Sequence, residues 1–365
     1  MREGWAWPVV VIPPQGGWDT DAGESVKYAM RLAEKALSTR RDAVRGFEVT
    51  FMFANIRGAK DLPAKVKEWR GMKCGAIVSF GDGAVNAELA RLCAVSGPSV
   101  IYAYGEDLAI KDASGSPYPY LFALDFTYFA RANALAALAT NENQLRSIAV
   151  ITDRTSDKLA KGAAKNVAML RKHGLEVLPM YVSAMRTLPL DIQVQTAAGS
   201  DAGVLTCWLD GMSAVSVWRA AENMPNRGMK VYYSGGKNNF LLDAEGLMLV
   251  DKDDVLNLDE AGHKLLKLSI SDALNKNVKD NVMAARAYAL AKWVVFAYEN
   301  SQSADALSIS RALSVAKEIP LSSEILSINP KTHRPEARKY AVLKVQGRKY
   351  VMVGTVNVYS EEIIE

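Results

Sequence analysis

The sequence is poor in cysteine and histidine, and neither residue occurs in a pattern that binds metal. Its 365 residues include only three cysteines and three histidines. No CxxC pair or zinc-type spacing occurs, so the sequence predicts no metal site and no cofactor. Cys74, Cys93 and Cys207 lie in apolar patterns typical of buried free thiols. A Cys74–Cys93 disulfide is the alternative in an oxidising compartment.

Long hydrophobic runs and clusters of one charge are also missing. No apolar stretch approaches the roughly 18 residues of a membrane span, so the chain is not expected to cross a membrane. The net charge of +4 is small and dispersed. Without a run of Lys or Arg, we expect neither nucleic acid nor an anionic membrane surface as a partner. The length predicts about two domains, and 49% hydrophobic residues suit a globular core.

The sequence contains no recognisable catalytic set and no apolar leader. No Ser–His–Asp or Cys–His combination is visible, and the carboxylates have no matching nucleophile, so we do not expect an enzyme. The chain starts on a strand, which excludes a repressor with an N-terminal helix-turn-helix. Met1 to Trp5 lead almost directly into the apolar residues 9–12. The protein is therefore either cytoplasmic or a mature exported form from which the signal peptide has been removed.

Apolar strands alternate with amphipathic helices over the first 250 residues, which predicts parallel sheets with right-handed crossovers. The number of units favours two doubly wound sheets, and residues 1–125 and 128–250 look like copies of one topology. Helical patterns at 260–274, 280–299 and 304–316 then break the alternation. A β-hairpin around Gly347 closes the chain. The expected strands are 9–12, 47–53, 75–80, 99–104, 148–152, 177–181, 202–208 and 230–233, and the expected helices between them are 25–37, 62–69, 84–95, 128–139, 159–172 and 213–223.

Five segments, in the same order, resemble the type I periplasmic binding proteins of the branched-chain amino acid (Leu/Ile/Val) transport group. The resemblance covers nearly the whole chain, and its most specific match is the closing segment, which is similar to that family's D-P-K-T-H-x-P hairpin. The five segments are PPQGGWDTDAGESVKYAMRLAEKAL, KCGAIVSFGDGAVNAELARLCAVSGPSVIYAYGED, YPYLFALDFTYFARANALAALA, LRSIAVITDRTSDKLAKGAAKNVAMLRKHGLEV and NPKTHRPEARKYAVLKVQGRKYVMV.

The resemblance implies an α/β protein of two doubly wound parallel-sheet lobes, joined by a three-strand hinge, with the ligand cleft between the lobes. By analogy, lobe I comprises residues 1–125 plus 252–330, and lobe II comprises 126–251 plus 331–365. The hinge positions are expected near Asp125, Asp251 and Asn329. The final hairpin is then covered within lobe II, which explains why a soluble chain ends on an apolar, basic hairpin.

Open α/β sheets bind ligands beyond the carboxyl ends of their strands, and this rule selects the candidate site. The loops in question are 15–20, 80–84, 102–107, 153–157, 208–211 and 235–239. Aromatic side chains in such loops offer large apolar contact at low entropic cost. Each of these side chains could instead cap or pack its own strand end. The candidate ligand-binding residues are Trp18, Phe80, Asp82, Tyr102, Tyr104, Glu106, Ser156, Trp208, Asp210 and Lys237.

The sequence departs from the family pattern where an amino acid would be anchored. The family binds the ligand carboxylate through Ser and Thr, but those places hold Gly83 and Ala84, and Glu106. An ionised Glu cannot donate a hydrogen bond and repels a carboxylate. The family's ammonium-binding acid is replaced by Gly236, which Lys237 follows. The sequence therefore predicts a ligand other than a standard α-amino acid.

The charges at the strand ends leave the class of ligand open. Asp82, Glu106 and Asp210, with aromatic neighbours, suit a cation. Lys237 and Arg154 favour a neutral, aromatic or singly acidic ligand. We expect a small polar or aromatic organic solute. Within the cleft, Trp18 and Trp208 are predicted to face each other and stack on it, with Glu106 and Asp210 supplying polar contacts.

The function predicted from the resemblance is that of a periplasmic receptor for an ABC transporter, which closes on its solute and delivers it to a membrane permease. The protein is expected to be a monomer or a weak dimer. The alternative is a cytoplasmic ligand-sensing regulator on the same fold. An apolar leader upstream of Trp5 in the native gene would favour the exported receptor.

Overall fold

The computed structural model describes residues 6–38, 48–105, 110–126, 130–142, 145–182, 189–224, 228–251, 280–301, 303–320 and 325–359. The chain divides into two compact units. Unit 1 contains residues 1–127 and 256–337, and unit 2 contains residues 128–255 and 338–365. The chain therefore passes between the units three times. Helix 260–274, expected from the sequence, lies outside the described residues.

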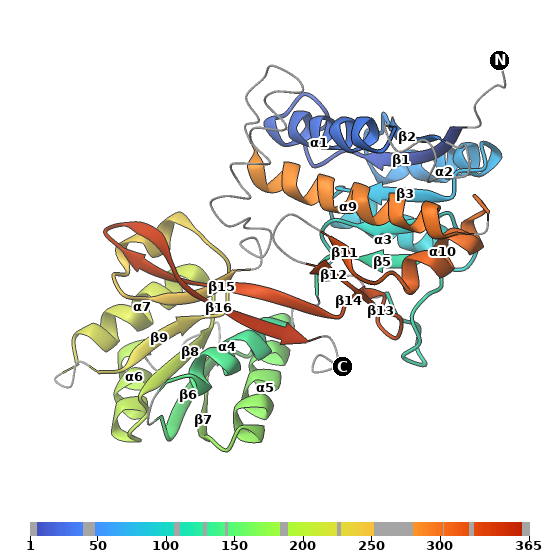
Figure 1. The fold of residues 1–365 in the computed structure, drawn as a ribbon. Coiled ribbons are helices and arrows are strands. Elements are labelled where there is room, and N and C mark those ends of the chain that lie inside the picture. The colour runs from blue at the N-terminus through green and yellow to red at the C-terminus, as the bar shows by residue number, and fades with distance from the viewer. Residues whose placement is uncertain are drawn as a thin grey trace, which may run out of the picture. The chain divides into compact units, whose positions relative to one another are not determined.

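Unit 1 is built on a five-stranded parallel sheet with the order β2-β1-β3-β4-β5. Strand β1 lies between β2 and β3, so the chain winds outward first to one side and then to the other (Figure 1). The loops after β1, β2 and β3 consequently leave the same edge of the sheet. The strands are β1 (Ala6–Ile12), β2 (Glu48–Phe53), β3 (Ala76–Ser79), β4 (Ser99–Tyr102) and β5 (Leu121–Ala123).

Helices cover both faces of this sheet, because alternate side chains of each strand point to opposite faces. Val9 and Val11 of β1 pack with α1, α9 and α10, whereas Val10 and Ile12 pack with α2 and α3. Helices α1 and α9 lie side by side although distant in sequence (Figure 1). The helices of unit 1 are α1 (Asp21–Ser38), η1 (Ala59–Asp61), α2 (Leu62–Gly71), α3 (Gly83–Cys93), α9 (Asn281–Asn300) and α10 (Ala306–Ser314).

Four short strands complete unit 1 in two antiparallel pairs, β11 (Ile319–Pro320) with β12 (Ile325–Leu326) and β13 (Ile328–Asn329) with β14 (Arg334–Pro335). The second pair lies before the third crossing, which follows Ala337. The resemblance had implied this crossing near residue 330. The turn of the second pair is held on β5, where the Ala123 N–H donates to the His333 carbonyl at 3.2 Å.

Unit 2 contains a seven-stranded sheet with the order β16-β15-β10-β9-β8-β6-β7. The five strands from β10 to β7 are parallel, and β15 is antiparallel to β10. One face packs on α6, α7 and η2, while α4 and α5 belong to the other face. The strands are β6 (Ser147–Asp153), β7 (Glu176–Val182), β8 (Val204–Trp208), β9 (Lys230–Tyr233), β10 (Met248–Asp251), β15 (Ala337–Gln346) and β16 (Lys349–Tyr359), and the helices are α4 (Ala130–Thr140), α5 (Asp157–Lys172), α6 (Leu190–Gly199), α7 (Gly211–Glu222) and η2 (Asn239–Asp243).

The two doubly wound, mainly parallel sheets predicted from the sequence are confirmed. The closing hairpin, β15 and β16, joins the sheet of unit 2, where Val342 and Leu343 lie opposite Val250 and Leu249 (Figure 1). It makes no pair with the sheet that contains β1. Its apolar residues at 340–343 are buried, as expected for a covered hairpin.

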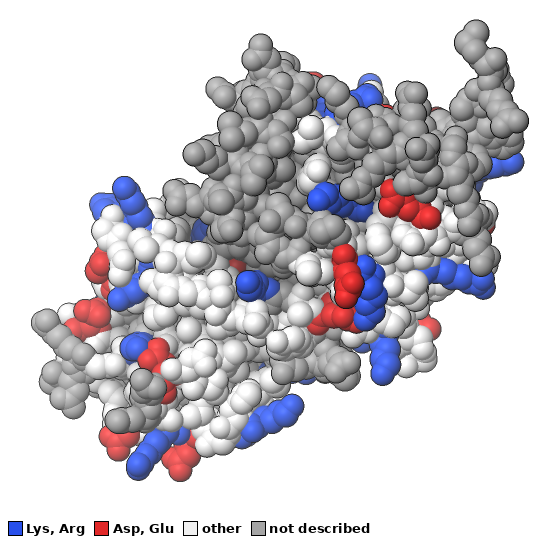
Figure 2. Space-filling view, viewed as in Figure 1, with Lys and Arg blue, Asp and Glu red and all other residues white. Residues whose placement is uncertain are grey.

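Charged side chains are distributed over the described surface of the molecule. On the face drawn in Figure 2, basic and acidic groups alternate among uncharged residues, without an extended field of one sign. This distribution agrees with the small net charge of +4. Within the described ranges, no helix combines the length and the apolar character needed to cross a membrane.

His333 is a buried imidazole at the turn between β13 and β14. Its ring stacks on Phe122 with centroids 4.3 Å apart, and Nδ1 lies 3.0 Å from the Leu121 carbonyl oxygen. A carbonyl only accepts, so Nδ1 carries the proton of the neutral ring. Burial lowers the pKa of His333, because the imidazolium form is poorly solvated there, although hydrogen bonds to backbone groups oppose this.

We expect His333 to make the protein less stable in acid. The unfolded imidazole titrates near pH 6.5 and the folded one below it, so the unfolded state binds more protons between the two values. The neutral His333 ring contributes fully to the free energy of unfolding above about pH 6.5. This contribution falls as the pH drops toward the folded pKa, by at most about 1.4 kcal/mol per pH unit. Urea unfolding of His333→Gln between pH 5 and 8 should show a shallower pH dependence than wild type. Exposed His173→Gln is the control, and an equal change in both variants would refute the assignment.

Candidate functional site

Loops at the carboxyl ends of β1, β2 and β3 enclose a pocket of about 460 Å³ in unit 1. This volume lies within the range of small-molecule sites, and the position is where parallel α/β sheets place them. All of the described lining residues belong to unit 1. The lining residues are Pro13, Pro14, Gln15, Gly16, Gly17, Ile56, Arg57, Gly58, Gly81, Asp82 and Val85.

The first wall of the pocket is a tight turn between β1 and α1. Gly16 and Gly17 have φ angles of 90° and 88°, a region that favours glycine. The Gly17 N–H donates to the Pro14 carbonyl at 3.0 Å, and the Thr20 hydroxyl donates to the Gly17 carbonyl at 3.0 Å. A Cβ at Gly23 would lie 2.3 Å from the Gly17 oxygen, so helix α1 approaches the turn closely.

Two charged side chains, Asp82 and Arg57, are among the described lining residues. They differ in whether the side chain makes hydrogen bonds within the protein. Asp82 is the N-cap of α3, and its Oδ1 accepts from the Val85 N–H at 2.9 Å. Arg57 is exposed, and only its backbone N–H is engaged, by the Asp61 carboxylate at 2.8 Å. Among the described residues, no hydrogen bond or ion pair holds the Arg57 guanidinium. Among the described lining residues, Arg57 is therefore the cation that is available to a ligand.

Sequence reasoning missed the loop that supplies Ile56, Arg57 and Gly58. The rule that selects strand-end loops applies equally to the loop after the expected strand 47–53, and following it there would have found Arg57. Two of the loops selected from the sequence share the lining of this pocket, one through Gln15 to Gly17 and the other through Gly81 and Asp82. Of the nine candidate residues that the structure describes, Asp82 alone lines this pocket.

Trp18 lies in the same turn but is held by its own unit. Its indole Nε1 donates to the Ala54 carbonyl at 2.7 Å, and its ring meets Phe53 edge-on at 5.2 Å. The Lys27 ammonium lies 5.3 Å from the ring centroid. The side chain is half-buried, and stacking of Trp18 on a ligand stays a prediction.

Phe80 and Tyr102 belong to the interior of unit 1, which corrects their expected role in the cleft. Phe80 is 3% exposed and packs in the core with β1 and α9. Tyr102 is fully buried, and its hydroxyl donates to the Asn86 carbonyl at 3.3 Å. Successive side chains of a strand point to opposite faces of the sheet, and helices cover both faces in unit 1. Phe80 and Tyr102 therefore pack under these helices, on opposite faces.

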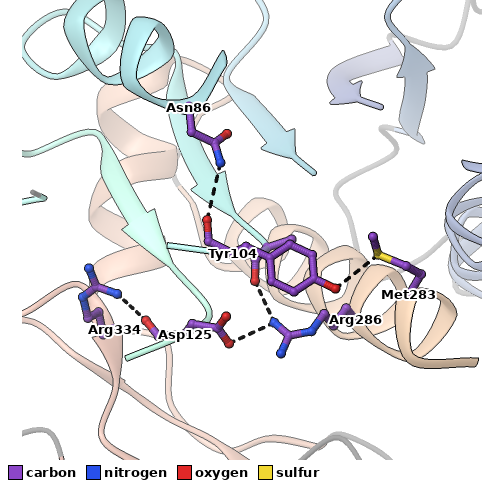
Figure 3. Close-up of polar contacts among 7 residues, drawn as sticks. Asn86, Tyr104, Asp125, Met283, Arg286 and Arg334 are labelled. Carbon is purple, nitrogen blue, oxygen red and sulfur yellow. Dashed lines mark hydrogen bonds and ion pairs between the residues drawn. The ribbon is translucent and has the colours of Figure 1, made fainter. Parts of the chain in front are cut away.

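Tyr104 lies at the end of β4 in a dense polar environment (Figure 3). Its hydroxyl donates to Met283 Sδ at 3.4 Å, and the Arg286 guanidinium lies 4.4 Å from its ring centroid. Its carbonyl accepts from Asn86 Nδ2 at 3.4 Å. The half-buried ring is therefore oriented by α9, while α3 binds the backbone carbonyl. Glu106, predicted as a polar anchor, lies outside the described residues.

In unit 2, Ser156 and Asp210 act as helix caps at strand ends. Ser156 accepts from the Leu159 N–H at 3.4 Å at the start of α5. Asp210 accepts from the Ser213 N–H at 3.0 Å and from the Ser213 hydroxyl at 2.5 Å at the start of α7. Each acceptor satisfies a first-turn N–H that the helix itself leaves without a partner.

Trp208 and Lys237 make their contacts within unit 2. The burial of Trp208 corrects the prediction that it forms an aromatic pair with Trp18 in the cleft. Trp208 is fully buried against α5, and its Nε1 donates to Asn166 Oδ1 at 3.4 Å. A ring without an exposed face cannot stack on a ligand. The Lys237 ammonium lies 3.6 Å from the Asp251 carboxylate, which is nearly inaccessible to solvent. The Arg154 guanidinium lies 3.6 Å from the Tyr181 ring centroid.

The three cysteines are free and buried. Burial raises the pKa of Cys74 to about 11 and that of Cys93 to about 12, and it also raises the pKa of Cys207, because a thiolate is poorly solvated inside the protein. These thiols are therefore poor nucleophiles. Within the described ranges, no three His, Cys, Asp or Glu side chains are placed to share a metal ion.

The family model for periplasmic binding proteins matches residues 7–349. The chain belongs to this family. It is a family of binding proteins, and its matched region includes both units and the loops around the pocket. No functionally curated protein sequence matches the chain significantly.

Solved structures of this family share its fold at low sequence identity. A putative branched-chain amino acid ABC transporter from Rhodospirillum rubrum has a TM-score of 0.71 at 16% identity, covering 96% of this chain and 100% of that one. A branched-chain amino acid periplasmic ligand-binding protein from Burkholderia xenovorans has a TM-score of 0.73 at 14% identity, covering 98% and 96%. A solute-binding protein from R. palustris in complex with benzoate has a TM-score of 0.59 at 14% identity, covering 97% of each chain.

The buried position of Trp208 can be tested through Gly162 of α5. A Cβ at Gly162 would lie 2.2 Å from the Trp208 ring, which has no room to retreat. We expect Gly162→Ala to lower the free energy of unfolding by about 1–3 kcal/mol, despite the higher helix propensity of alanine. Gly199→Ala at the end of α6 is the control, since no atom lies within 4 Å of its Cβ position. Chemical unfolding is the measurement, and equal stability of the two variants would contradict this packing.

Proposed function

We propose that this protein is the extracytoplasmic solute-binding receptor of an ABC transporter, which hands a small organic solute to a membrane permease. The proposal is supported by membership of the periplasmic binding protein family and by the likeness to solved ABC transporter components. The observation that carries it is the pocket at the strand ends of unit 1. The periplasm is the compartment in which such a receptor acts.

The complete ligand site is proposed to lie between the lobes. The pocket of unit 1 supplies one wall, and the strand-end loops of unit 2 supply the other. A ligand that touches both lobes binds the closed form more tightly than the open form, so it shifts the population toward closure. Closure of two domains about a hinge is a general response of this kind.

The proposed solute is a small polar or aromatic molecule rather than a standard α-amino acid. Gly83 and Ala84 have no hydroxyl for a ligand carboxylate, and Gly236 has no acid for an ammonium group. The Lys237 ammonium is already near Asp251. Arg57 offers a donor pair that suits an acidic group, and one structural neighbour holds benzoate.

Thermal-shift measurements with benzoate, benzamide, choline and leucine test the class of ligand. A solute at about 100 times its Kd adds roughly 2.7 kcal/mol of stability. We expect benzoate or benzamide to raise the Tm more than leucine or choline does. A larger effect of leucine would refute the proposed ligand class but leave the receptor function standing.

Small-angle scattering with and without the stabilising solute tests closure of the lobes. An unchanged radius of gyration at saturation would contradict the receptor mechanism.

The role of Arg57 separates acidic from neutral solutes. A charge-assisted hydrogen bond contributes about 1.5–3 kcal/mol, so Arg57→Gln should weaken binding of a carboxylate solute by about 10- to 100-fold. The affinity for the matching amide should change little. Calorimetry with benzoate and benzamide gives both numbers. Lys60→Gln, an exposed cation outside the pocket, is the matched control, and equal effects of the two variants would show that only the general field of charge matters.

A further inference from the structure

Two buried arginines meet where the chain leaves unit 1. Asp125 lies two residues before the end of the first segment of unit 1 at Thr127, and Arg334 lies three residues before the end of the second segment at Ala337. Arg286 projects from α9 toward the same place (Figure 3). The cluster therefore adjoins both the first and the third crossing, which are more than 200 residues apart in sequence.

Arg286 is fully buried and makes three different kinds of contact. Its Nη1 lies 2.9 Å from Asp125 Oδ1 and donates to the Ala103 carbonyl at 2.7 Å. Its guanidinium also faces the Tyr104 ring at 4.4 Å. A buried charge is costly unless paired, and removal of one partner of such a pair is strongly destabilising. These contacts therefore determine the positions of Ala103, Tyr104 and Asp125 together.

Arg334 connects the same strand ends from the other side. Its Nη1 donates to the Asp125 carbonyl, and its Nη2 donates to the Gly105 carbonyl at 3.0 Å. The guanidinium fork is rigid and planar, so it fixes the distance between the two carbonyls that it binds. Its neighbour His333 adds the stacking on Phe122 and the hydrogen bond to Leu121.

The network connects three segments that would otherwise be independent loops. Carbonyl groups of Ala103 and Gly105 lie beyond β4, and that of Asp125 lies beyond β5. Both arginines bind across the two strand ends, one from α9 and one from the segment of the third crossing. The loop that carries Tyr104, the exit to the first crossing and the approach to the third crossing are thereby combined into one rigid body.

We propose that Arg286 and Arg334 are positioning residues for solute capture, because they anchor the first and third crossing segments and the Tyr104 loop as the fixed end of the hinge. The role in capture rests on the receptor function proposed above. A fixed anchor limits the arrangements that the two lobes sample without ligand. Without the anchor, the lobes sample more arrangements, and a smaller fraction of them can close on the solute. The apparent Kd then rises, because it equals the intrinsic Kd divided by this competent fraction.

Unit 2 shows a related pair at its own exit. Asp251 is the last residue of β10, four residues before the end of that segment at Val255, and it is buried beside the Lys237 ammonium at 3.6 Å. In both units, a buried aspartate with a cationic partner thus lies close to a crossing. Since Lys237 is half-exposed and monodentate, the anchor in unit 1 is the more rigid of the two.

Arg334→Lys is the decisive variant, since it keeps the charge but loses the fork. Arg70→Lys is the control away from the crossings: Arg70, which is more exposed than Arg334, donates to the Leu92 carbonyl at 2.7 Å and to the Gly97 carbonyl at 2.8 Å. Both variants lose a carbonyl-binding arginine of unit 1. A purely structural role predicts lower stability in both, without a difference in hinge behaviour.

Spin labels on exposed positions report the hinge without any ligand. Lys67→Cys in unit 1 and Lys172→Cys in unit 2 provide the sites, and the native thiols are buried. Pulsed dipolar EPR gives the distribution of distances between them. We expect Arg334→Lys to broaden this distribution and Arg70→Lys to leave it as in wild type. An unchanged width in Arg334→Lys, or equal broadening in Arg70→Lys, would overturn the proposal.

Asp125→Asn is the second variant, which serves if Arg334→Lys does not fold. It keeps an acceptor for Arg286 but removes the charge, so we expect intermediate broadening and faster hydrogen exchange at Ala103 and Leu124, whose N–H groups donate to the Ser79 and Tyr102 carbonyls. Wild-type width and exchange in Asp125→Asn would also refute the anchor. Affinity for the stabilising solute of the panel should weaken several-fold in the anchor variants alone. Because the distance measurement needs no solute, its result stands whether or not the receptor function does.

Discussion

Parallel pairing of β1 between β2 and β3 is the constraint on which the candidate site depends. Parallel strands must all be entered from the same edge, so the chain has to return through a helix after each one. The three loops that follow these strands then share the opposite edge, and there they enclose the pocket with Arg57 and Asp82. Helices on both faces of the sheet keep those strand ends rigid, so the loops can hold polar groups in place.

Helix capping and ligand binding compete for the side chains at the strand ends of this fold. A helix begins shortly after each strand, and its first N–H groups need acceptors. Asp82, Ser156 and Asp210 supply them, which accounts for acidic and hydroxyl residues at these points without reference to any ligand. Arg57 differs because the fold uses only its backbone N–H, so its side chain is the stronger indication of binding.

Buried charge is concentrated near the crossings. Asp125 and Arg286 form an ion pair that is almost inaccessible to solvent, and Asp251 is buried beside Lys237. An apolar cluster would pack the same space with less desolvation cost, but it would not fix the backbone carbonyls of two strand ends at set distances. Directional bonds are suited to segments that must keep their positions while the chain continues into another lobe.

Strand and helix periodicity by itself determined the α/β class, the two doubly wound sheets and the closing hairpin, because the alternation of apolar residues is a local property. Periodicity did not predict the short or atypical elements, because β5 has only three residues and α6 and β10 lack a strong pattern. Tertiary structure alone decided that Trp208 is buried beneath Gly162 and that Arg57 reaches the pocket. Position after a strand does not tell whether a side chain turns toward a helix or toward solvent, since that choice depends on which distant residues fill the space around it.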